Sequence, residues 1–203
     1  EFPEFSRASL EAMRQPLEDG YVTIARAAAT ATLPARFMLV AAMNPCPCGY
    51  YGDSKRSCSC AEMQVSRYQR RLSGPLMDRL DLFVDVPRVE YAELTGEPTG
   101  ERSEVVRDRV IRAREVQQER LAGTAYITNS DMGPREVRQF CQDPLTDEAK
   151  PLLATATERL GLSARAFHRV LKVARTIADL DGSEEIGTVH LGEAIQYRRR
   201  AVE

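Results

Sequence analysis

The stretch RFMLVAAMNPCPCGYYGDSKRSCSC, residues 36–60, carries the clearest structural signals in the chain. Its first part, RFMLVAAM, is a nearly continuous apolar run, which is typical of a β-strand covered on both faces. Asn44 follows this run directly, at the carboxyl end of the predicted strand. Because ligands of open α/β sheets bind at the carboxyl ends of the strands, the sequence predicts a binding edge at Asn44.

Four of the five cysteines follow in the same stretch, as two C-x-C pairs. Cys46, Cys48, Cys58 and Cys60 give the pattern C-x-C-x9-C-x-C, and four thiolates suit a closed tetrahedral zinc site. The C-x-C spacing is tighter than zinc ligand pairs usually show, so a loop without metal stays an alternative. A redox pair is disfavoured because no C-x-x-C occurs.

Upstream of this stretch, the sequence predicts a helix and a hairpin. Ser6 is a good N-cap for a helix over residues 7–15, which we expect Pro16 to end. YVTIAR, residues 21–26, alternates apolar and polar side chains as a half-buried strand does. ATATLP, residues 29–34, is expected to pair back with it as a hairpin.

Downstream, the pattern becomes helical. Residues 61–80 predict two short helices split at Ser73-Gly74-Pro75, and DLFVDVP, residues 81–87, predicts another strand. Beyond Ser103 the apolar periodicity predicts only helices. They are expected over residues 104–121, 134–141, 147–160, 164–180 and 189–200.

The sequence therefore predicts part of an α/β sheet domain followed by an all-α domain. We place the sheet domain at residues 1–88, a linker at 89–102 and the helical domain at 103–203. Within the helical domain, Ser163 and Thr188 are the expected N-caps of the last two helices.

Composition narrows the class of protein. The 203 residues are 43% hydrophobic, which is enough for one substantial core or two small ones. The 28 basic and 30 acidic residues give a formal net charge of −2, so contacts to nucleic acid must come from local patches. No run of about 18 apolar residues predicts a membrane span. The odd, clustered cysteines suit a reducing cytoplasm, with Cys141 a buried and inert helix residue.

Four separated segments together resemble the motifs of one ATPase family. EFPEFSR, residues 1–7, is similar to the tail of a Walker B segment, and LVAAMNP, residues 39–45, to a sensor 1 strand. SGPLMDRLDL, residues 73–82, resembles an arginine-finger segment, and residues 161–180 resemble the sensor 2 helix of a lid. With the Cys-Pro-Cys-Gly insert, their order and spacing resemble magnesium-chelatase-like AAA+ ATPases of the ComM/YifB (competence protein) branch. The resemblance covers essentially the whole chain.

The resemblance implies a fold and a cofactor. The fold would be a partial AAA+ P-loop NTPase sheet domain followed by a helical lid domain, and the full protein would bind ATP and Mg²⁺. No G-x-x-x-x-G-K-[ST] motif occurs in the sequence. We therefore expect the chain to be the C-terminal part of such an ATPase, starting within Walker B, and not to hydrolyse ATP alone.

The resemblance also implies roles for four residues at the nucleotide. Glu1 matches the Walker B glutamate that activates the attacking water, and Asn44 matches sensor 1, which holds that water or the γ-phosphate. Arg79 matches the arginine finger, which acts on a neighbouring subunit's nucleotide and implies a homo-oligomeric ring, expected to be a hexamer. Arg165 matches the sensor 2 arginine, at the start of the lid helix.

Each of these residues also has a plainer interpretation. The Walker B candidate would be a solvated terminal carboxylate, and the sensor 1 candidate would be an asparagine that caps a turn before proline. Arg79 would pair with Asp78 or Asp81, and Arg70 and Arg71 are weaker competitors for the finger role. The sensor 2 candidate would be an exposed arginine.

The predicted hairpin precedes the sensor 1 segment, where related ring helicases place a DNA-contacting insert. Arg26 and Thr30 lie near its turn and are the DNA-binding candidates. The alternative is a hairpin that packs on a neighbouring subunit. The implied function is an ATP-driven DNA branch-migration motor in natural transformation. The alternatives are a magnesium-chelatase-type subunit that remodels a metal-insertion partner, and a non-catalytic, zinc-stabilised interaction module.

Overall fold

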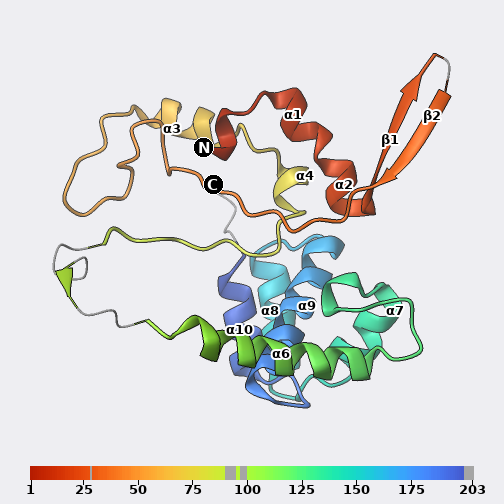
Figure 1. The fold of residues 1–203 in the computed structure, drawn as a ribbon. Helices are drawn as coiled ribbons and strands as arrows, with labels where there is room; N and C mark the ends of the chain where they lie inside the picture. Colours follow the sequence, from red (N-terminus) through yellow and green to blue (C-terminus); the bar gives the residue numbers. More distant parts are fainter. Residues whose placement is uncertain (28, 90–94, 97–99, 199–203) are drawn as a thin grey trace. The chain divides into compact units, whose positions relative to one another are not determined.

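The computed structural model describes residues 1–27, 29–89, 95–96 and 100–198. The chain divides into two compact units, Glu1–Leu80 and Asp81–Glu203, called unit 1 and unit 2 below (Figure 1). The sequence predicted a linker at residues 89–102. Much of that stretch, residues 90–94 and 97–99, lies outside the described residues, so the linker stays a prediction.

Unit 1 is built from short helices around a small apolar core. They are η1 (Phe2–Glu4), α1 (Arg7–Ala12), α2 (Arg14–Asp19), α3 (Glu62–Gln69) and α4 (Gly74–Met77). Phe2, Leu10, Leu72 and Leu76 are buried together, and Met13 and Leu17 are among the side chains that pack against them. This confirms the predicted split at Ser73, whose hydroxyl caps α4.

The first helix differs from the prediction at Pro16. Ser6 caps α1 as expected, by accepting a hydrogen bond from the Ser9 amide at 3.1 Å. Pro16, however, lies inside the first turn of α2 instead of ending a helix. A first-turn residue needs no intrahelical N–H donor, so proline is compatible with this position.

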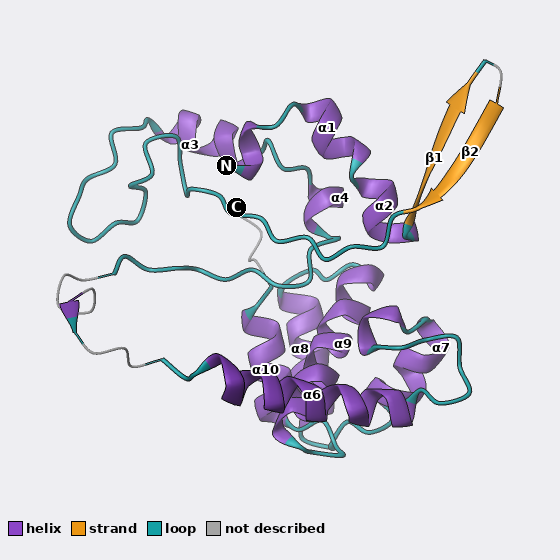
Figure 2. Ribbon diagram, in the orientation of Figure 1, coloured by secondary structure: helices purple, strands orange, loops and turns teal. Residues whose placement is uncertain are grey.

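The predicted hairpin is confirmed, with the expected bounds. Strand β1 (Tyr21–Arg26) pairs antiparallel with β2 (Ala29–Pro34), and Tyr21 lies opposite Pro34 while Arg26 lies opposite Ala29. Gly20, with φ of 71°, turns the chain from α2 into β1. Among the described residues these are the only two strands of a sheet (Figure 2).

The larger sheet expected around residues 36–43 and 81–87 does not form in the described part of the chain. Both segments are unpaired, because no other described segment offers them a partner strand. Most of their side chains are exposed: Met38 is 87% exposed, Val40 82% and Val86 83%. Leu39 and Met43 are exceptions, because they pack against the core of unit 1. Extended apolar segments become strands only when neighbours satisfy their backbone groups. Unit 1 is therefore mixed α/β, but its sheet is the hairpin alone.

Unit 2 is helical, as predicted, apart from an isolated bridge between Leu145 and Ile186. Its elements are α6 (Ser103–Arg120), η2 (Asn129–Asp131), α7 (Pro134–Val137), the π-turn η3 (Arg138–Gln142), α8 (Ala149–Arg159), α9 (Ala164–Asp181) and α10 (Thr188–Gln196). The apolar stripe of α9 faces the core. Cys141 is fully buried there, as expected, and burial raises the pKa of its thiol to about 12, which disfavours the reactive thiolate.

The two predicted N-caps had different outcomes. Ser163 caps α9 by accepting a hydrogen bond from the Ala166 amide at 3.2 Å. Thr188 is instead the first residue of α10, and the cap position is Gly187. The amide of Gly187 donates to Nδ1 of His190 at 3.1 Å, so the imidazole at the third helical position satisfies the amide of the cap residue.

A buried polar network joins α6, α9 and η2. Arg175 is 1% exposed, and its Nε donates to Asp179 Oδ1 at 3.0 Å. Arg120 donates to the same carboxylate, with its Nη1 2.9 Å from Oδ2, and Asn129 Nδ2 donates to Oδ2 at 2.8 Å. Because the carboxylate is satisfied from three sides, the network fixes these elements relative to one another.

No described helix of either unit is long and apolar enough to cross a membrane.

Candidate functional site

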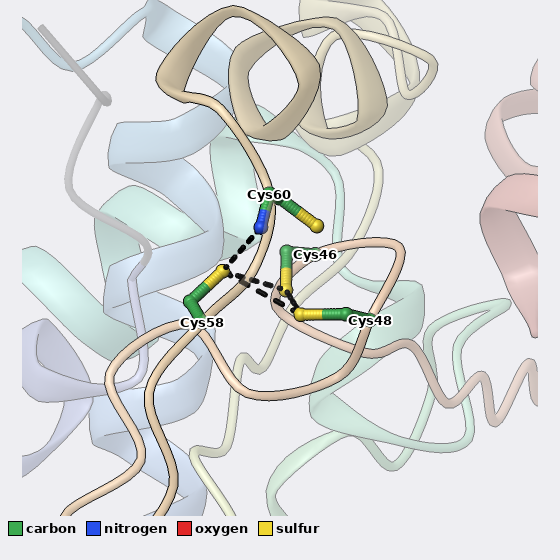
Figure 3. Close-up of side chains that lie close together, drawn as sticks. All are labelled: Cys46, Cys48, Cys58 and Cys60. Carbon is green, nitrogen blue, oxygen red and sulfur yellow. Dashed lines mark hydrogen bonds between the residues drawn. The ribbon is translucent and has the colours of Figure 1, made fainter.

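Four thiols from the two C-x-C pairs converge in unit 1 (Figure 3). The Sγ atom of Cys46 lies 3.4 Å from that of Cys48 and 3.6 Å from that of Cys58, and the last two are 3.5 Å apart. All four ligand atoms, including that of Cys60, lie within 4.8 Å of one another. The structure therefore brings together the four residues that sequence spacing singled out.

The spacing of these sulfur atoms fits a tetrahedral metal site. A Zn–S bond of about 2.3 Å in a regular tetrahedron separates the sulfurs by about 3.8 Å. The observed separations of 3.4 to 3.6 Å are close to that value and far longer than a disulfide bond of about 2.05 Å. The tight C-x-C spacing is thus compatible with a four-thiolate site, because the intervening loop brings the second pair back onto the first.

Local turns shape this loop. Gly49 and Gly52 have φ of 84° and 83°, in the left-handed region that favours glycine. The Gly49 amide donates to the Cys46 carbonyl at 3.0 Å, which folds the first pair into a turn. Gln69 of α3 donates to the Pro45 carbonyl at 3.1 Å and ties the loop to the helix that follows it.

The four thiols differ in acidity. Hydrogen bonds from the backbone of Tyr50 and Ser59 lower the pKa of Cys48 to about 5. The backbone of Cys60 lowers the pKa of Cys58, but burial and the neighbouring thiols outweigh it and raise that pKa to about 12. The cluster by itself therefore stabilises negative charge on Cys48 and disfavours it on Cys58. A divalent cation is the charge that would let all four act as thiolates.

Glu1 and Asn44 come close together through the backbone. The amino group of Glu1 and the amide of Phe2 both donate to the Ala42 carbonyl, at 2.8 and 2.9 Å. The candidate Walker B residue thus lies beside the segment that ends in the candidate sensor residue. Both side chains are exposed. Tyr68 of α3, which is buried, has a hydrogen bond with the backbone of Asn44.

Arg79 lies at the end of α4 and is only 10% exposed. Its Nη1 donates to the Pro75 carbonyl at 2.6 Å, and its Nε lies 3.1 Å from Oε2 of Glu18. This Nε is buried and makes no hydrogen bond to any described atom, so the Glu18 contact is an ion pair without hydrogen-bond geometry. Sequence reasoning considered Asp78 and Asp81 as partners and missed Glu18. No local signal reveals a partner that lies so far away along the chain.

The remaining candidates lie on the surface and apart from the thiol cluster in sequence. Arg165 is exposed in the first turn of α9, in unit 2. Arg26 ends β1 and Thr30 lies in β2 opposite Ala25, and both are exposed. Their position beside the turn of the hairpin is as expected, while residue 28 within that turn lies outside the described residues. The contacts in unit 1 bring Glu1 to the Asn44 segment and leave the hairpin candidates at their own end of the unit.

Comparison with known proteins covers both units. The family description "Magnesium chelatase, subunit ChlI" matches residues 1–94, and "Magnesium chelatase, subunit ChlI C-terminal" matches residues 100–198. Over 98% of this chain, the sequence is 47% identical to competence protein ComM of Haemophilus influenzae and 45% identical to the uncharacterized protein YifB of Escherichia coli. It is 40% identical to the uncharacterized protein Rv2897c of Mycobacterium tuberculosis. The chain spans 38% of the length of the first two and 39% of the third.

Proposed function

Because this chain belongs to the magnesium chelatase subunit ChlI family, we propose that the full-length protein is an AAA+ ATPase that moves DNA. It would use Mg-ATP, assemble as a homo-oligomeric ring of six subunits, work in the cytoplasm and drive branch migration during transformation and recombination. The observation that carries the nucleotide half of this proposal is the pair of hydrogen bonds from residues 1 and 2 to Ala42. The DNA half is supported by the likeness to a competence protein.

Glu1 and Asn44 would act together on the water that attacks the γ-phosphate. The contact with Ala42 holds the backbone of Glu1 against the segment that ends in Asn44, which supports a shared role for the two side chains. Arg165, exposed at the start of α9, would contact the nucleotide as the sensor 2 arginine of a lid formed by unit 2. We expect the 203-residue chain alone not to hydrolyse ATP, since it contains no P-loop motif.

Arg79 would be the arginine finger. In the single chain its guanidinium is buried against Glu18, with one nitrogen lacking a hydrogen-bond partner among the described residues. An arginine paired in this way is held near the surface of α4 but is not fully satisfied, so a phosphate from a neighbouring subunit would compete for it. The role therefore requires the side chain to exchange Glu18 for the nucleotide when the ring assembles.

The hairpin would contact DNA through Arg26. Every described residue of β2 is exposed, and of β1 only Val22 is partly covered, so the hairpin offers its surface to a ligand. Arg26 lies at the end of β1 beside the turn, where a guanidinium reaches a phosphate without reading bases. Thr30 would add a hydroxyl contact from the opposite strand.

Replacing Arg26 with alanine should weaken DNA binding by the full-length protein. Loss of one phosphate contact should reduce the slope of log K against log salt by about 1 and act equally on all sequences. Fluorescence anisotropy at several salt concentrations would measure both. Arg138→Ala, which removes another exposed arginine, is the matched control and should change neither. A slope unchanged by Arg26→Ala would contradict this role for the hairpin.

We also propose that the four-cysteine cluster holds structural Zn²⁺. The sulfur separations fit a tetrahedral site, and four protein ligands complete its coordination, so no position is left open for a substrate. When bound, the metal would cross-link the two halves of the loop beside Asn44. The chain itself brings the four thiols together, and Gln69 ties Pro45 to α3.

Two other functions compete with the DNA motor. A chelatase-type ATPase that remodels a metal-insertion partner would share the family description and the nucleotide residues. A non-catalytic, zinc-stabilised interaction module would use only the cysteine loop and the helical unit. The exposed hairpin and the likeness to a competence protein favour the DNA motor over both.

The test is ATP hydrolysis by the full-length protein with no DNA, with linear duplex and with a four-way junction. A DNA-remodelling motor should be stimulated most by the junction. A rate that no DNA changes would favour the chelatase-type alternative, and no hydrolysis under any condition would favour the non-catalytic module.

A further inference from the structure

One cavity of unit 1 is surrounded by arginine side chains. It has a volume of about 730 Å³ and lies between residues 4–10 and one face of α3 with the segment that follows. Only one carboxylate, that of Glu4, lines it together with four guanidinium groups. These belong to Arg7, Arg67, Arg70 and Arg71. Since the whole chain has a formal net charge of −2, this positive excess is local.

The carboxylate is already engaged. Arg71 Nη1 donates to Glu4 Oε2 at 2.7 Å and to the Pro3 carbonyl at 3.2 Å. Arg67 and Arg70 are exposed, and their guanidinium groups have no hydrogen-bond or ion-pair partner among the described residues. Like charges facing one cavity repel each other, so an anion placed between them would be stabilised.

Arg67 and Arg70 lie on one face of α3 and the residue that follows it, so both can bind the same ligand. Met63, Ser66, Arg67 and Arg70 all line the cavity and follow the i, i+3, i+4, i+7 spacing of one helix face. The last of them directly follows α3, in a helical conformation that continues this face. The two guanidinium groups are thus neighbours, and a guanidinium presents two parallel N–H donors that match the oxygens of a phosphate.

The cavity also has an apolar wall. Phe5 is 63% exposed and Met63 is 71% exposed, although both are large apolar side chains in a unit that has a core. An exposed aromatic ring beside unpaired arginines is the combination that binds a nucleotide unit, because the ring stacks on a base while the arginines hold its phosphate. The cavity volume is within the range of small-ligand sites, about 300–1,000 Å³.

We propose that this cavity binds a phosphate-bearing nucleotide unit, either a free nucleotide or one unit of a single-stranded nucleic acid. Arg67 and Arg70 hold the phosphate, and Phe5 stacks on the base. The proposal rests on the cavity alone and is separate from the hairpin contact and from the ATPase roles proposed above. Because the 203-residue chain carries no P-loop motif, a nucleotide that it binds is not held by a P-loop.

The experiment measures binding of fluorescein-labelled oligothymidylate to the 203-residue chain by anisotropy, with ADP as the competing free nucleotide. The double variant Arg67→Gln/Arg70→Gln should bind at least about tenfold more weakly. Its slope of log K against log salt should be shallower by about 0.7, since the contact with one single-strand phosphate is lost. Arg135→Gln/Arg138→Gln, on exposed residues of α7 and η3, is the control with the same charge change.

Two further variants separate the cavity from a general charge effect. Glu4→Gln removes the cavity's carboxylate and should tighten binding, the opposite of a destabilising mutation. Phe5→Ala should weaken oligothymidylate binding by about tenfold without changing the salt slope. Displacement of the oligonucleotide by ADP at micromolar concentration would identify a free-nucleotide site, and its failure at millimolar concentration would identify a nucleic-acid site. Equal binding by the cavity and control double variants, with circular dichroism showing both folded, would overturn the proposal.

Discussion

Replacing Arg79 with alanine in the full-length protein should lower the rate of ATP hydrolysis by about 10³-fold or more while leaving nucleotide binding nearly unchanged. The guanidinium would act on charge that develops only in the transition state, so its loss affects the rate constant and not the ground-state affinity. Steady-state hydrolysis and equilibrium binding of a fluorescent ATP analogue measure the two quantities separately. A variant that keeps most of its activity would contradict the finger role.

Glu18→Gln is the control for this variant. It breaks the same ion pair, which involves side chains that are 10% and 27% exposed, but it keeps the guanidinium. Both variants should lower the melting temperature by a similar amount, whereas only Arg79→Ala should lose hydrolysis. If Glu18→Gln lost activity equally, the role of Arg79 would be to stabilise unit 1.

Mixing subunits tests whether Arg79 acts across an interface. Glu1→Gln subunits keep the finger and lack the proposed base, and Arg79→Ala subunits have the reverse defect. A ring in which Arg79 reaches the neighbouring nucleotide should recover part of the hydrolysis when the two inactive proteins are mixed. A mixture as inactive as its components would indicate that both residues act within one subunit.

Replacing Cys46 and Cys58 together with serine should abolish metal binding and unfold the loop of residues 45–60. The isolated chain should carry one Zn²⁺, and removing two of four thiolates leaves too few ligands for a closed site. Structural zinc in small domains contributes about 10–16 kcal/mol of apparent binding free energy, so its loss should be visible as a lower melting temperature. Elemental analysis of the purified chain and thermal unfolding with and without a chelator measure both effects.

Cys141→Ser is the matched control for the cysteine variant. Cys141 is buried in unit 2, remote in sequence from the cluster, and its substitution should leave the metal content at one ion per chain. Substitution by Co²⁺ adds a spectroscopic check, because tetrahedral thiolate coordination gives intense visible absorption. A wild-type chain that contains no metal and melts at the same temperature with and without a chelator would contradict the zinc site.

Local structure followed closely from the sequence. The hairpin of residues 21–34 was predicted to its strand bounds, since alternation and the short connection both act between near neighbours. The predicted caps at Ser6 and Ser163 depend on a hydroxyl and an amide three positions later, so local sequence specifies them, whereas the cap predicted at Thr188 was wrong. The cysteine spacing likewise indicated a four-thiolate cluster before the distances were known.

Interactions between distant segments were decided only by the tertiary structure. Residues 36–43 have the composition of a buried strand but remain unpaired in the described chain, because a strand exists only with a neighbour that its own sequence does not specify. The pairing of Arg79 with Glu18 and the gathering of arginines from α1 and α3 around one cavity also join segments far apart in the chain. Periodicity and spacing report contacts within a few residues, whereas packing selects which distant side chains meet. The sequence by itself therefore determined the hairpin, most of the helices and the spacing of the four cysteines, and the tertiary structure decided the partner of Arg79 and which arginines line the cavity of unit 1.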